Sequence, residues 1–283
     1  MRLFCFGYGY SAEALVRRLS PRDAAVAGTR TSLGDTVPPG IELSLFSGDA
    51  PSPDLRKLLA GSTHVLVSIP PDLEGDPVLR HHRDDLAALS ELVWVGYLST
   101  VGVYGDHKGA WVDEETRVQP TSERSLRRLQ AEQEWGIFGE DTGRRVEIYR
   151  LAGIYGPGRS IIDNLRAGTA RRIVKPGQVF NRIHVDDIAR VLAVAIDKDT
   201  GHRIYNVSDD KPAPPEEVVA YAAELLGLPV PPVVAIENAG LSGMAASFWA
   251  ESKRVSNRRM REDLGVQLLY PTYREGLRAL ARA

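Results

Sequence analysis

A short apolar run followed by closely spaced glycines and then a helical pattern opens this chain. Residues 2–6 have strand length, and Gly7-Tyr8-Gly9-Tyr10-Ser11-Ala12 follows them directly. Residues 11–19 then carry apolar side chains at helical spacing. A G-x-G-x-x-A turn between a strand and a helix is the dinucleotide-binding fingerprint, and its position predicts that the fold begins with a β-α-β unit.

The positions of this turn have distinct physical roles. Gly7 permits a tight turn, Gly9 lets the backbone approach a pyrophosphate, and Ala12 is small enough for the helix to pack on the strand. Backbone N–H groups at Tyr10 and Ser11, together with the helix dipole, favour phosphate at the helix start. A glycine-rich turn without a ligand is the alternative. We predict that these five residues bind a cofactor.

Apolar runs of strand length recur along the chain and alternate with amphipathic helical patterns. Several runs are nearly continuous in Val, Leu and Ile, which is typical of parallel strands covered on both faces. The alternation predicts an α/β fold with a doubly wound parallel sheet, the Rossmann architecture, of about seven strands. Strands are expected at 2–6, 24–28, 41–45, 64–69, 92–98, 145–151 and 203–207, and helices at 11–19, 79–89, 122–135 and 185–196.

The pattern changes near residue 156, where Gly156-Pro157-Gly158 interrupts it. The residues from 211 onward are mostly helical and rich in proline, with helices expected at 215–226 and 257–264. We predict two domains. A dinucleotide-binding Rossmann domain comprises 1–156 plus 181–210, and a smaller, mainly helical substrate lobe comprises 157–180 plus 211–283.

The end of the second strand bears on the choice of cofactor. An NAD-selective site places Asp or Glu roughly 20 residues after the glycines, where it holds the ribose 2′-hydroxyl. Here the strand ends in Thr29-Arg30-Thr31-Ser32, without an acid at its tip. The Arg30 guanidinium is suited to a 2′-phosphate, although a solvated loop cation is the alternative. NADP is therefore expected as the cofactor, with NAD the less favoured choice.

Ligands of open α/β sheets bind at the carboxyl ends of the strands, so residues there are further candidates. Asp49 follows the third strand and is expected to contact the adenine amine. Ser68 and Pro70 close the fourth strand, where the Pro-Pro pair either fixes a loop beside the cofactor or only ends the strand. Ser99, near the end of the fifth strand, completes the predicted cofactor set.

Three further segments carry a resemblance to a known family. They are Ser-Thr-Val-Gly-Val-Tyr-Gly at 99–105, Tyr-Arg-Leu-Ala-Gly-Ile-Tyr-Gly-Pro-Gly-Arg at 149–159, and Asn-Arg-Ile-His-Val-Asp-Asp-Ile-Ala at 181–189. With the opening glycines, in this order along essentially the whole chain, they resemble the extended short-chain dehydrogenase/reductase family, the NAD-dependent epimerase/dehydratase group. The resemblance implies that Thr100 hydrogen-bonds the reacting carbonyl or hydroxyl and that Tyr155 belongs to a loop beside the nicotinamide.

One departure from that family concerns its working pair, a Tyr and a Lys four residues later on one helix face. With Glu132 as the anchor, Arg128 occupies the lysine position and Arg124 the tyrosine position. A guanidinium has no acceptor and a pKa above about 12, so it cannot exchange a proton near neutrality. Arg128 could still bind a ribose or phosphate, and Arg124 an anionic substrate group. Tyr104 and Tyr155 are the other candidate proton donors, although a packed aromatic is the favoured interpretation of each, and Tyr155 is also a predicted substrate contact.

Two functions remain open at this stage. One is an NADP-binding reductase or epimerase-like enzyme that acts on a small carbonyl or sugar-like substrate, with hydride transfer supplied by the nicotinamide. The other is a non-catalytic NADP-binding regulator or redox sensor, which is consistent with arginines at both catalytic positions. The atypical pair therefore leaves enzymatic turnover undecided from the residues alone.

Composition excludes several other classes. Lys and Arg number 35 against 37 Asp and Glu, so the charge of −2 indicates no nucleic-acid partner. Apolar runs are too short for a bilayer or a secretory signal, and no spacing of His, Cys, Asp and Glu predicts a metal. The single cysteine, Cys5, lies in an apolar run and is expected to be buried. We expect a cytoplasmic protein with a small-molecule substrate or effector, and the resemblance alone implies a homodimer.

Overall fold

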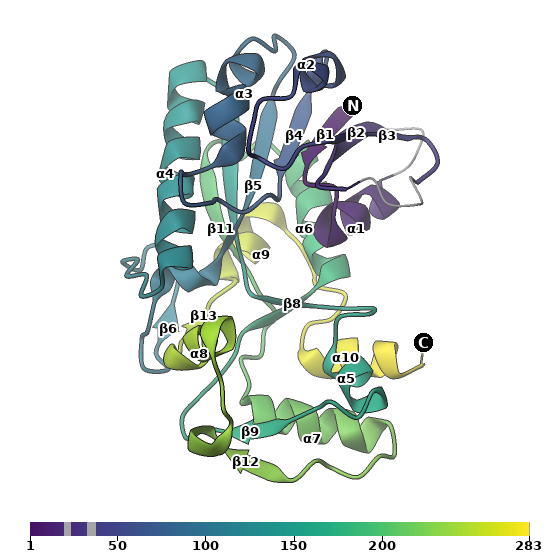
Figure 1. Cartoon of the computed structure of the whole chain (residues 1–283), viewed down its shortest axis with the longest axis vertical. Coiled ribbons are helices and arrows are strands. Elements are labelled where there is room, and N and C mark those ends of the chain that lie inside the picture. The colour runs from purple at the N-terminus through teal and green to yellow at the C-terminus, as the bar shows by residue number, and fades with distance from the viewer. Residues whose placement is uncertain (20–23, 33–37, 283) are drawn as a thin grey trace. The chain divides into compact units, whose positions relative to one another are not determined.

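The computed structural model of the chain describes residues 1–19, 24–32 and 38–282. A seven-stranded sheet in the order β11-β7-β5-β4-β1-β2-β3 forms its centre, and the pairs β1–β2, β1–β4, β2–β3 and β4–β5 are parallel (Figure 1). This confirms the predicted Rossmann architecture. The strands are β1 (Arg2–Phe6), β2 (Ala25–Arg30), β3 (Ile41–Leu45), β4 (His64–Val67), β5 (Trp94–Thr100), β7 (Arg145–Leu151) and β11 (Arg203–Val207).

The first strand lies where the strand order reverses. Phe4 of β1 pairs with Ala27 of β2 on one side and with Val65 of β4 on the other. From β1 the chain proceeds outward to β2 and β3, and then returns to β4 on the opposite side. Ligands of doubly wound sheets bind at this switch point, outside the carboxyl ends of the strands. The residues directly after β1 therefore occupy the position that the fold provides for a ligand.

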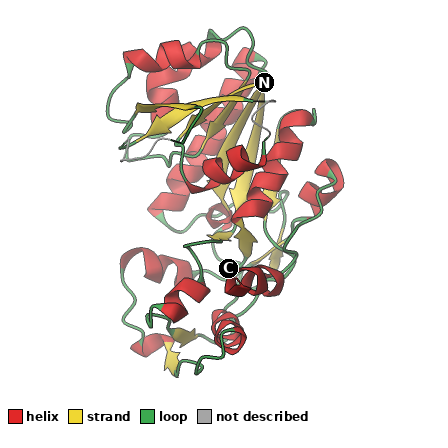
Figure 2. Cartoon of the chain, turned by 90° about the vertical axis from the view of Figure 1, so that its right-hand side faces the viewer, coloured by secondary structure: helices red, strands yellow, loops and turns green. Residues whose placement is uncertain are grey.

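Helices cover both faces of this sheet. In Figure 1, α2, α3 and α4 lie on one side and α1 and α6 on the other, and Figure 2 shows the strands between helices. The helix predicted over 122–135 continues to Thr142, through Gly136 and Gly139. The helices are α1 (Tyr10–Arg18), α2 (Pro53–Leu59), α3 (Pro77–Ala87), α4 (Glu123–Thr142) and α6 (Val185–Asp197).

An aromatic-rich core fills the space between the sheet and the α2, α3 and α4 layer. Full burial of one large apolar side chain contributes about 1.5–3 kcal/mol, and this cluster includes several that are wholly buried, among them Trp135 and Phe138. Trp135 also donates its Nε1–H to Asp76, the N-cap residue of α3, across 3.1 Å. This hydrogen bond joins α4 to the start of α3.

The remaining chain forms short helices and three two-stranded parallel pairs, β8–β10, β9–β12 and β6–β13. Helices occur at the two places expected, although the strand pairs were not predicted. The elements are the 3-10 turns η1 (Val101–Tyr104) and η2 (Ile236–Asn238), the strands β6 (Trp111–Val112), β8 (Gly153–Tyr155), β9 (Arg172–Val174), β10 (Arg182–His184), β12 (Val233–Ala235) and β13 (Arg254–Val255), and the helices α5 (Ile161–Arg166), α7 (Pro215–Leu225), α8 (Gly243–Ala250), α9 (Arg258–Leu264) and α10 (Tyr273–Arg282).

Two compact units divide the chain. The first comprises 1–100, 123–150 and 188–205, and the second comprises 101–122, 151–187 and 206–283. These ranges differ from the predicted domains chiefly at 101–122, which belongs to the second unit because β6 pairs with β13, Trp111 opposite Arg254. Residues 181–187 also belong there, because β10 pairs with β8.

Candidate functional site

The turn between β1 and α1 is fixed by two neighbouring strands. Gly7 has a φ of +87°, a conformation that favours glycine, and a Cβ there would lie 2.6 Å from the Ser68 hydroxyl. The Gly7 N–H donates to Thr29 Oγ1 at 2.9 Å, and Ser68 Oγ donates to the Gly7 carbonyl at 2.5 Å. The end of β2 and the end of β4 thus hold this glycine in place, as the predicted tight turn requires.

The start of α1 is left open in front of this turn. Gly9 is the N-cap residue and provides no side-chain cap, and a Cβ built on it would meet nothing within 4 Å. Tyr10 and Ser11 form the first helical positions, and Ala12 is wholly buried against the sheet. A helix start whose N-cap residue has no side chain, with space before it, is suited to a phosphate group.

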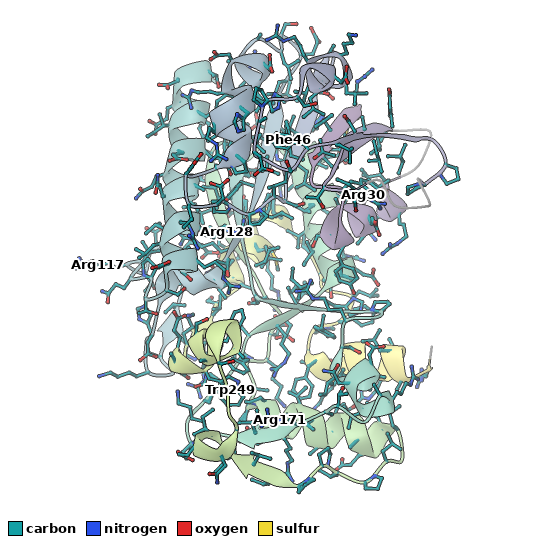
Figure 3. All side chains as sticks on the ribbon, viewed as in Figure 1. Arg30, Phe46, Arg117, Arg128, Arg171 and Trp249 are labelled. Atoms are coloured by element: carbon teal, nitrogen blue, oxygen red, sulfur yellow. The ribbon has the colours of Figure 1, made fainter. Side chains whose placement is uncertain are left out.

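Arg30 is the last residue of β2 and lies beside the same turn (Figure 3). Its Nε donates to the Tyr8 carbonyl at 2.9 Å, and its guanidinium carbon lies 5.3 Å from the centre of the Tyr8 ring. Its Nη2 also lies 2.5 Å from Glu13 Oε1 in an ion pair. Arg30 is therefore a positioned residue and not the freely solvated cation of the alternative interpretation.

Three residues of this region were missed by the sequence reasoning. Thr29 is wholly buried, and both its hydroxyl and its carbonyl accept hydrogen bonds from the turn, the carbonyl from Tyr8 N at 2.6 Å. Tyr8 supplies the surface under Arg30, and Glu13 supplies its counter-charge. An acid in the first turn of α1 was visible in the sequence. Its partner was not, because the contact depends on how β2 lies beside β1.

The other strand ends are occupied in different ways. Asp49 is exposed beyond β3, and its predicted contact with an adenine amine stays a prediction. Phe46, which precedes it, is buried, and its N–H donates to the Arg30 carbonyl at 3.0 Å. The Ser68 hydroxyl is directed at Gly7, so its role is to hold the turn. Pro70 is exposed. Both interpretations of the Pro-Pro pair, a loop fixed beside the cofactor or a simple strand end, stay predictions.

Ser99 belongs to a buried network, and its predicted cofactor contact stays a prediction. Its hydroxyl donates to Glu132 Oε1 at 2.5 Å, and the residue is 5% exposed. Glu132, on α4, is held in turn by Arg150 of β7, whose Nη2 lies 2.7 Å from Oε2. The hydroxyl points into the interior toward this ion pair and thereby ties β5 to α4.

The two arginines at the expected catalytic positions lie one turn apart on α4. Arg128 donates from Nη1 to the Leu98 carbonyl at 2.6 Å, and its guanidinium carbon lies 5.7 Å from the centre of the Tyr97 ring (Figure 3). Arg124 is half-buried, as is Thr100 at the end of β5. The Arg128 side chain is thus hydrogen-bonded to the backbone of β5 at Leu98, two residues before Thr100.

Tyr104, considered as a proton donor, lies in the second unit at the end of η1. It is wholly buried, and its hydroxyl donates to Asn206 Oδ1 at 2.8 Å. A buried phenol whose proton is already committed to a buried amide is a packed aromatic. This geometry agrees with the packed-aromatic interpretation, and a catalytic role of Tyr104 stays a prediction.

Tyr155, at the end of β8, is also packed within the second unit. Its ring meets the His184 ring edge to face at 5.1 Å between centroids, and the residue is 8% exposed. Burial, followed by the negative charge of Asp209, raises the pKa of this phenol well above its ordinary value. This shift makes Tyr155 a poor source of catalytic acid at neutral pH, and its predicted substrate contact stays a prediction.

The described part of the chain carries no recognisable metal cluster and no membrane-spanning helix. Within residues 1–19, 24–32 and 38–282, no group of three or more His, Cys, Asp or Glu is placed to hold a metal ion. No helix of that described part combines the length and the apolar character needed to cross a bilayer. Cys5 is buried, as expected, and burial raises the pKa of its thiol to about 12.

Known proteins that resemble this chain include one family and two relatives that match nearly its whole length. A model of the NAD-dependent epimerase/dehydratase family matches residues 86–208. The protein YeeZ of Escherichia coli K12 is 27% identical over 94% of this chain and 94% of its own length. A functionally unknown conserved protein from Silicibacter pomeroyi DSS is 48% identical, with a TM-score of 0.91, over 99% of this chain and 98% of that one.

Solved structures with bound coenzymes share the fold at lower identity. MoeE5, in complex with UDP-glucuronic acid and NAD, has a TM-score of 0.78 and 21% identity over 99% of this chain and 97% of its own. The human epimerase family protein SDR39U1, with NADPH, has a TM-score of 0.75 and 18% identity over 100% of this chain and 99% of its own. The architecture described here therefore occurs in proteins that hold either coenzyme.

Proposed function

The chain belongs to the NAD-dependent epimerase/dehydratase family, and from this we propose that it binds a nicotinamide dinucleotide at the turn between β1 and α1, with NADP preferred over NAD. The observation that carries the proposal is the start of α1, where the N-cap residue Gly9 has no side chain. There Gly9 leaves space for the diphosphate, and Gly7 is locked by Thr29 and Ser68. Helix dipole and backbone N–H groups favour a diphosphate at this point.

The preference for NADP rests on Arg30. It ends β2, the strand whose tip reads the adenosine ribose in dinucleotide-binding sheets, and Tyr8 holds its guanidinium in place. Phosphate pairs with a guanidinium through short, charged hydrogen bonds. Asp49, exposed beyond β3, is the proposed contact of the adenine amine.

We assign the reaction to a small carbonyl or sugar-like substrate. The nicotinamide, when bound, would supply the hydride, Thr100 would hydrogen-bond the reacting oxygen, and that oxygen would take its proton from water. Arg124 binds an anionic group of the substrate, because its guanidinium donates hydrogen bonds and accepts none. Arg128, anchored on the Leu98 carbonyl, contacts the coenzyme ribose or phosphate. The family resemblance supports a homodimer as the working assembly.

Calorimetric titration with NADPH and NADH tests the coenzyme proposal. Wild type is expected to bind NADPH more tightly, and Arg30→Ala to lose NADPH affinity by one to two orders of magnitude with NADH affinity changed little, since a charged pair with phosphate contributes about 1.5–3 kcal/mol. Arg18→Ala is the matched control, because Arg18 is exposed in the last turn of α1. Unchanged NADPH affinity in Arg30→Ala would remove Arg30 from the site.

Turnover is tested separately, by following NADPH oxidation against a panel of aldehydes, ketones and nucleotide sugars. Hydride exchange with one class of carbonyl, reduced at least tenfold in Thr100→Val, supports the enzymatic assignment. Tight binding of both coenzymes with no exchange across the panel would contradict it. That outcome would favour the alternative, a regulator that responds to the NADP redox state.

A further inference from the structure

Glu13 lies beside the predicted site of the coenzyme's adenosine ribose. Its side chain takes no part in the turn that would hold the diphosphate. It lies in the first turn of α1, one residue after Ala12, and its Oε1 contacts Arg30 Nη2 at 2.5 Å. The Arg30 and Glu13 side chains are 23% and 35% exposed, so both remain accessible to a ligand. A carboxylate and a guanidinium therefore stand side by side at the tip of β2.

We infer that Glu13 and Arg30 form a paired subsite for the adenosine ribose, in which Glu13 favours the 2′-hydroxyl of NAD and limits the preference that Arg30 gives to NADP. The inference deepens the proposed function and rests on it. The sequence has no acid at the tip of β2, but the fold brings Glu13 of α1 to that position. Glu13 is thereby a specificity-determining residue for the coenzyme.

Charge explains why the carboxylate opposes a 2′-phosphate. A phosphate ester bound to Arg30 would lie close to the Glu13 carboxylate, because the two side chains are in contact. Like charges this close repel when they are partly shielded from water. Glu13 also occupies one guanidinium donor that a phosphate oxygen would take. A ribose hydroxyl, by contrast, donates a hydrogen bond that a carboxylate accepts well.

The ion pair also helps to position Arg30. The size of that contribution decides whether removal of the Glu13 charge strengthens or weakens NADPH binding. Arg30 keeps two other restraints without Glu13, its Nε bond to the Tyr8 carbonyl at 2.9 Å and its packing over the Tyr8 ring. Because these restraints hold the guanidinium at the tip of β2, loss of the carboxylate charge frees Arg30 for phosphate more than it disorders it. The net effect of removing the charge is tighter binding of NADPH.

The test is the ratio of NADH to NADPH dissociation constants in wild type and in Glu13→Gln, measured by calorimetry. Glutamine keeps the side chain's size and one acceptor oxygen but removes the charge. The ratio is expected to rise on the order of tenfold toward NADPH, equivalent to about 1.4 kcal/mol, and the difference between the proteins should shrink at high salt. Glu13→Ala is expected to move the ratio in the same direction.

Glu91→Gln provides the matched control, because Glu91 is exposed just before β5, at the sheet edge opposite the carboxyl ends of the strands. A ratio unchanged within twofold in Glu13→Gln, or shifted toward NADH, overturns the inference even when wild type binds both coenzymes. Failure of the proposed function has a different signature. Wild type would then bind neither coenzyme, and both the site and the subsite would be rejected together.

Discussion

Gly7 and Gly9 have different reasons to be glycine, although the sequence motif treats them alike. At Gly7 the backbone has a positive φ and Ser68 leaves no room for a Cβ. At Gly9 the backbone is extended and the space around the Cβ position is open. The first glycine therefore serves the fold, and the second serves the ligand.

This difference makes a paired prediction. Gly7→Ala should lower the free energy of unfolding by about 1–3 kcal/mol because of the unfavourable φ and the contact with Ser68. Gly9→Ala should leave stability within about 0.5 kcal/mol and still weaken both coenzymes at least tenfold, since its methyl group fills the space for the diphosphate. Urea unfolding and calorimetry measure the two quantities. Equal stability of the two variants would contradict the assigned roles.

The residues that the sequence could predict are those whose role is local. Gly7, Gly9 and Ala12 follow one another along the chain, so a single short motif specifies them. The partners that complete the site are not local, because Thr29 and Ser68 reach Gly7 only when β2 and β4 flank β1. The contact of Glu13 with Arg30 depends on the same pairing, and no pattern in the sequence links the two.

Among the elements, α4 shows how packing overrides local preference. Its apolar pattern predicts an end near residue 135, before Gly136 and Gly139, yet the helix continues to Thr142. Gly139 is required there, because a Cβ would lie 2.7 Å from the His202 ring. A glycine that reads as a helix breaker is in this case a site of close approach to β11. Sequence alone cannot distinguish the two uses.

A buried ion pair connects α4 to the strands on which it packs. Arg150→Met would leave Glu132, 3% exposed, as an unpaired charge beside Ser99. Removal of one partner of a buried pair costs about 3–5 kcal/mol, and the free energy of unfolding measured in urea should fall by that amount. The double variant Arg150→Met with Glu132→Leu should recover most of the loss. If the double variant is no more stable than Arg150→Met, the ion pair stabilises the folded state by more than the cost of burying its two charges.

At the scale of the whole molecule, the first unit was predictable and the second was not. Seven apolar runs separated by helical patterns specify the central sheet. The second unit instead relies on strands of two or three residues, such as β6 with β13, which pair across more than a hundred residues of chain. Pairs this short leave no periodic pattern, so the sequence indicates only a proline-rich helical lobe.

The pH dependence of global stability should reflect Asp209. This residue is 1% exposed, and burial raises the pKa of its carboxyl to about 8. The folded state then holds a proton that the unfolded state releases near pH 4. Its contribution to stability is present below pH 4 and is lost as the pH rises toward 8.

Asp209→Asn removes this titration. Between pH 4 and 8 the free energy of unfolding of wild type should fall relative to that of the variant, by up to about 1.4 kcal/mol per pH unit, and the difference should level off above pH 8. Denaturant unfolding at several pH values measures it. A difference that stays constant with pH would show that Asp209 does not titrate in this range.

The most direct test of the central claim, that the β1–α1 turn holds the diphosphate of a nicotinamide dinucleotide, is amide hydrogen exchange with and without saturating NADPH. Exchange of the amides at 10–12 is predicted to slow on addition of the coenzyme, because phosphate oxygens would accept hydrogen bonds at the start of α1. Exchange in α9 should stay unchanged. Exchange at 10–12 that is unaffected by millimolar NADPH and by millimolar NADH would contradict the claim.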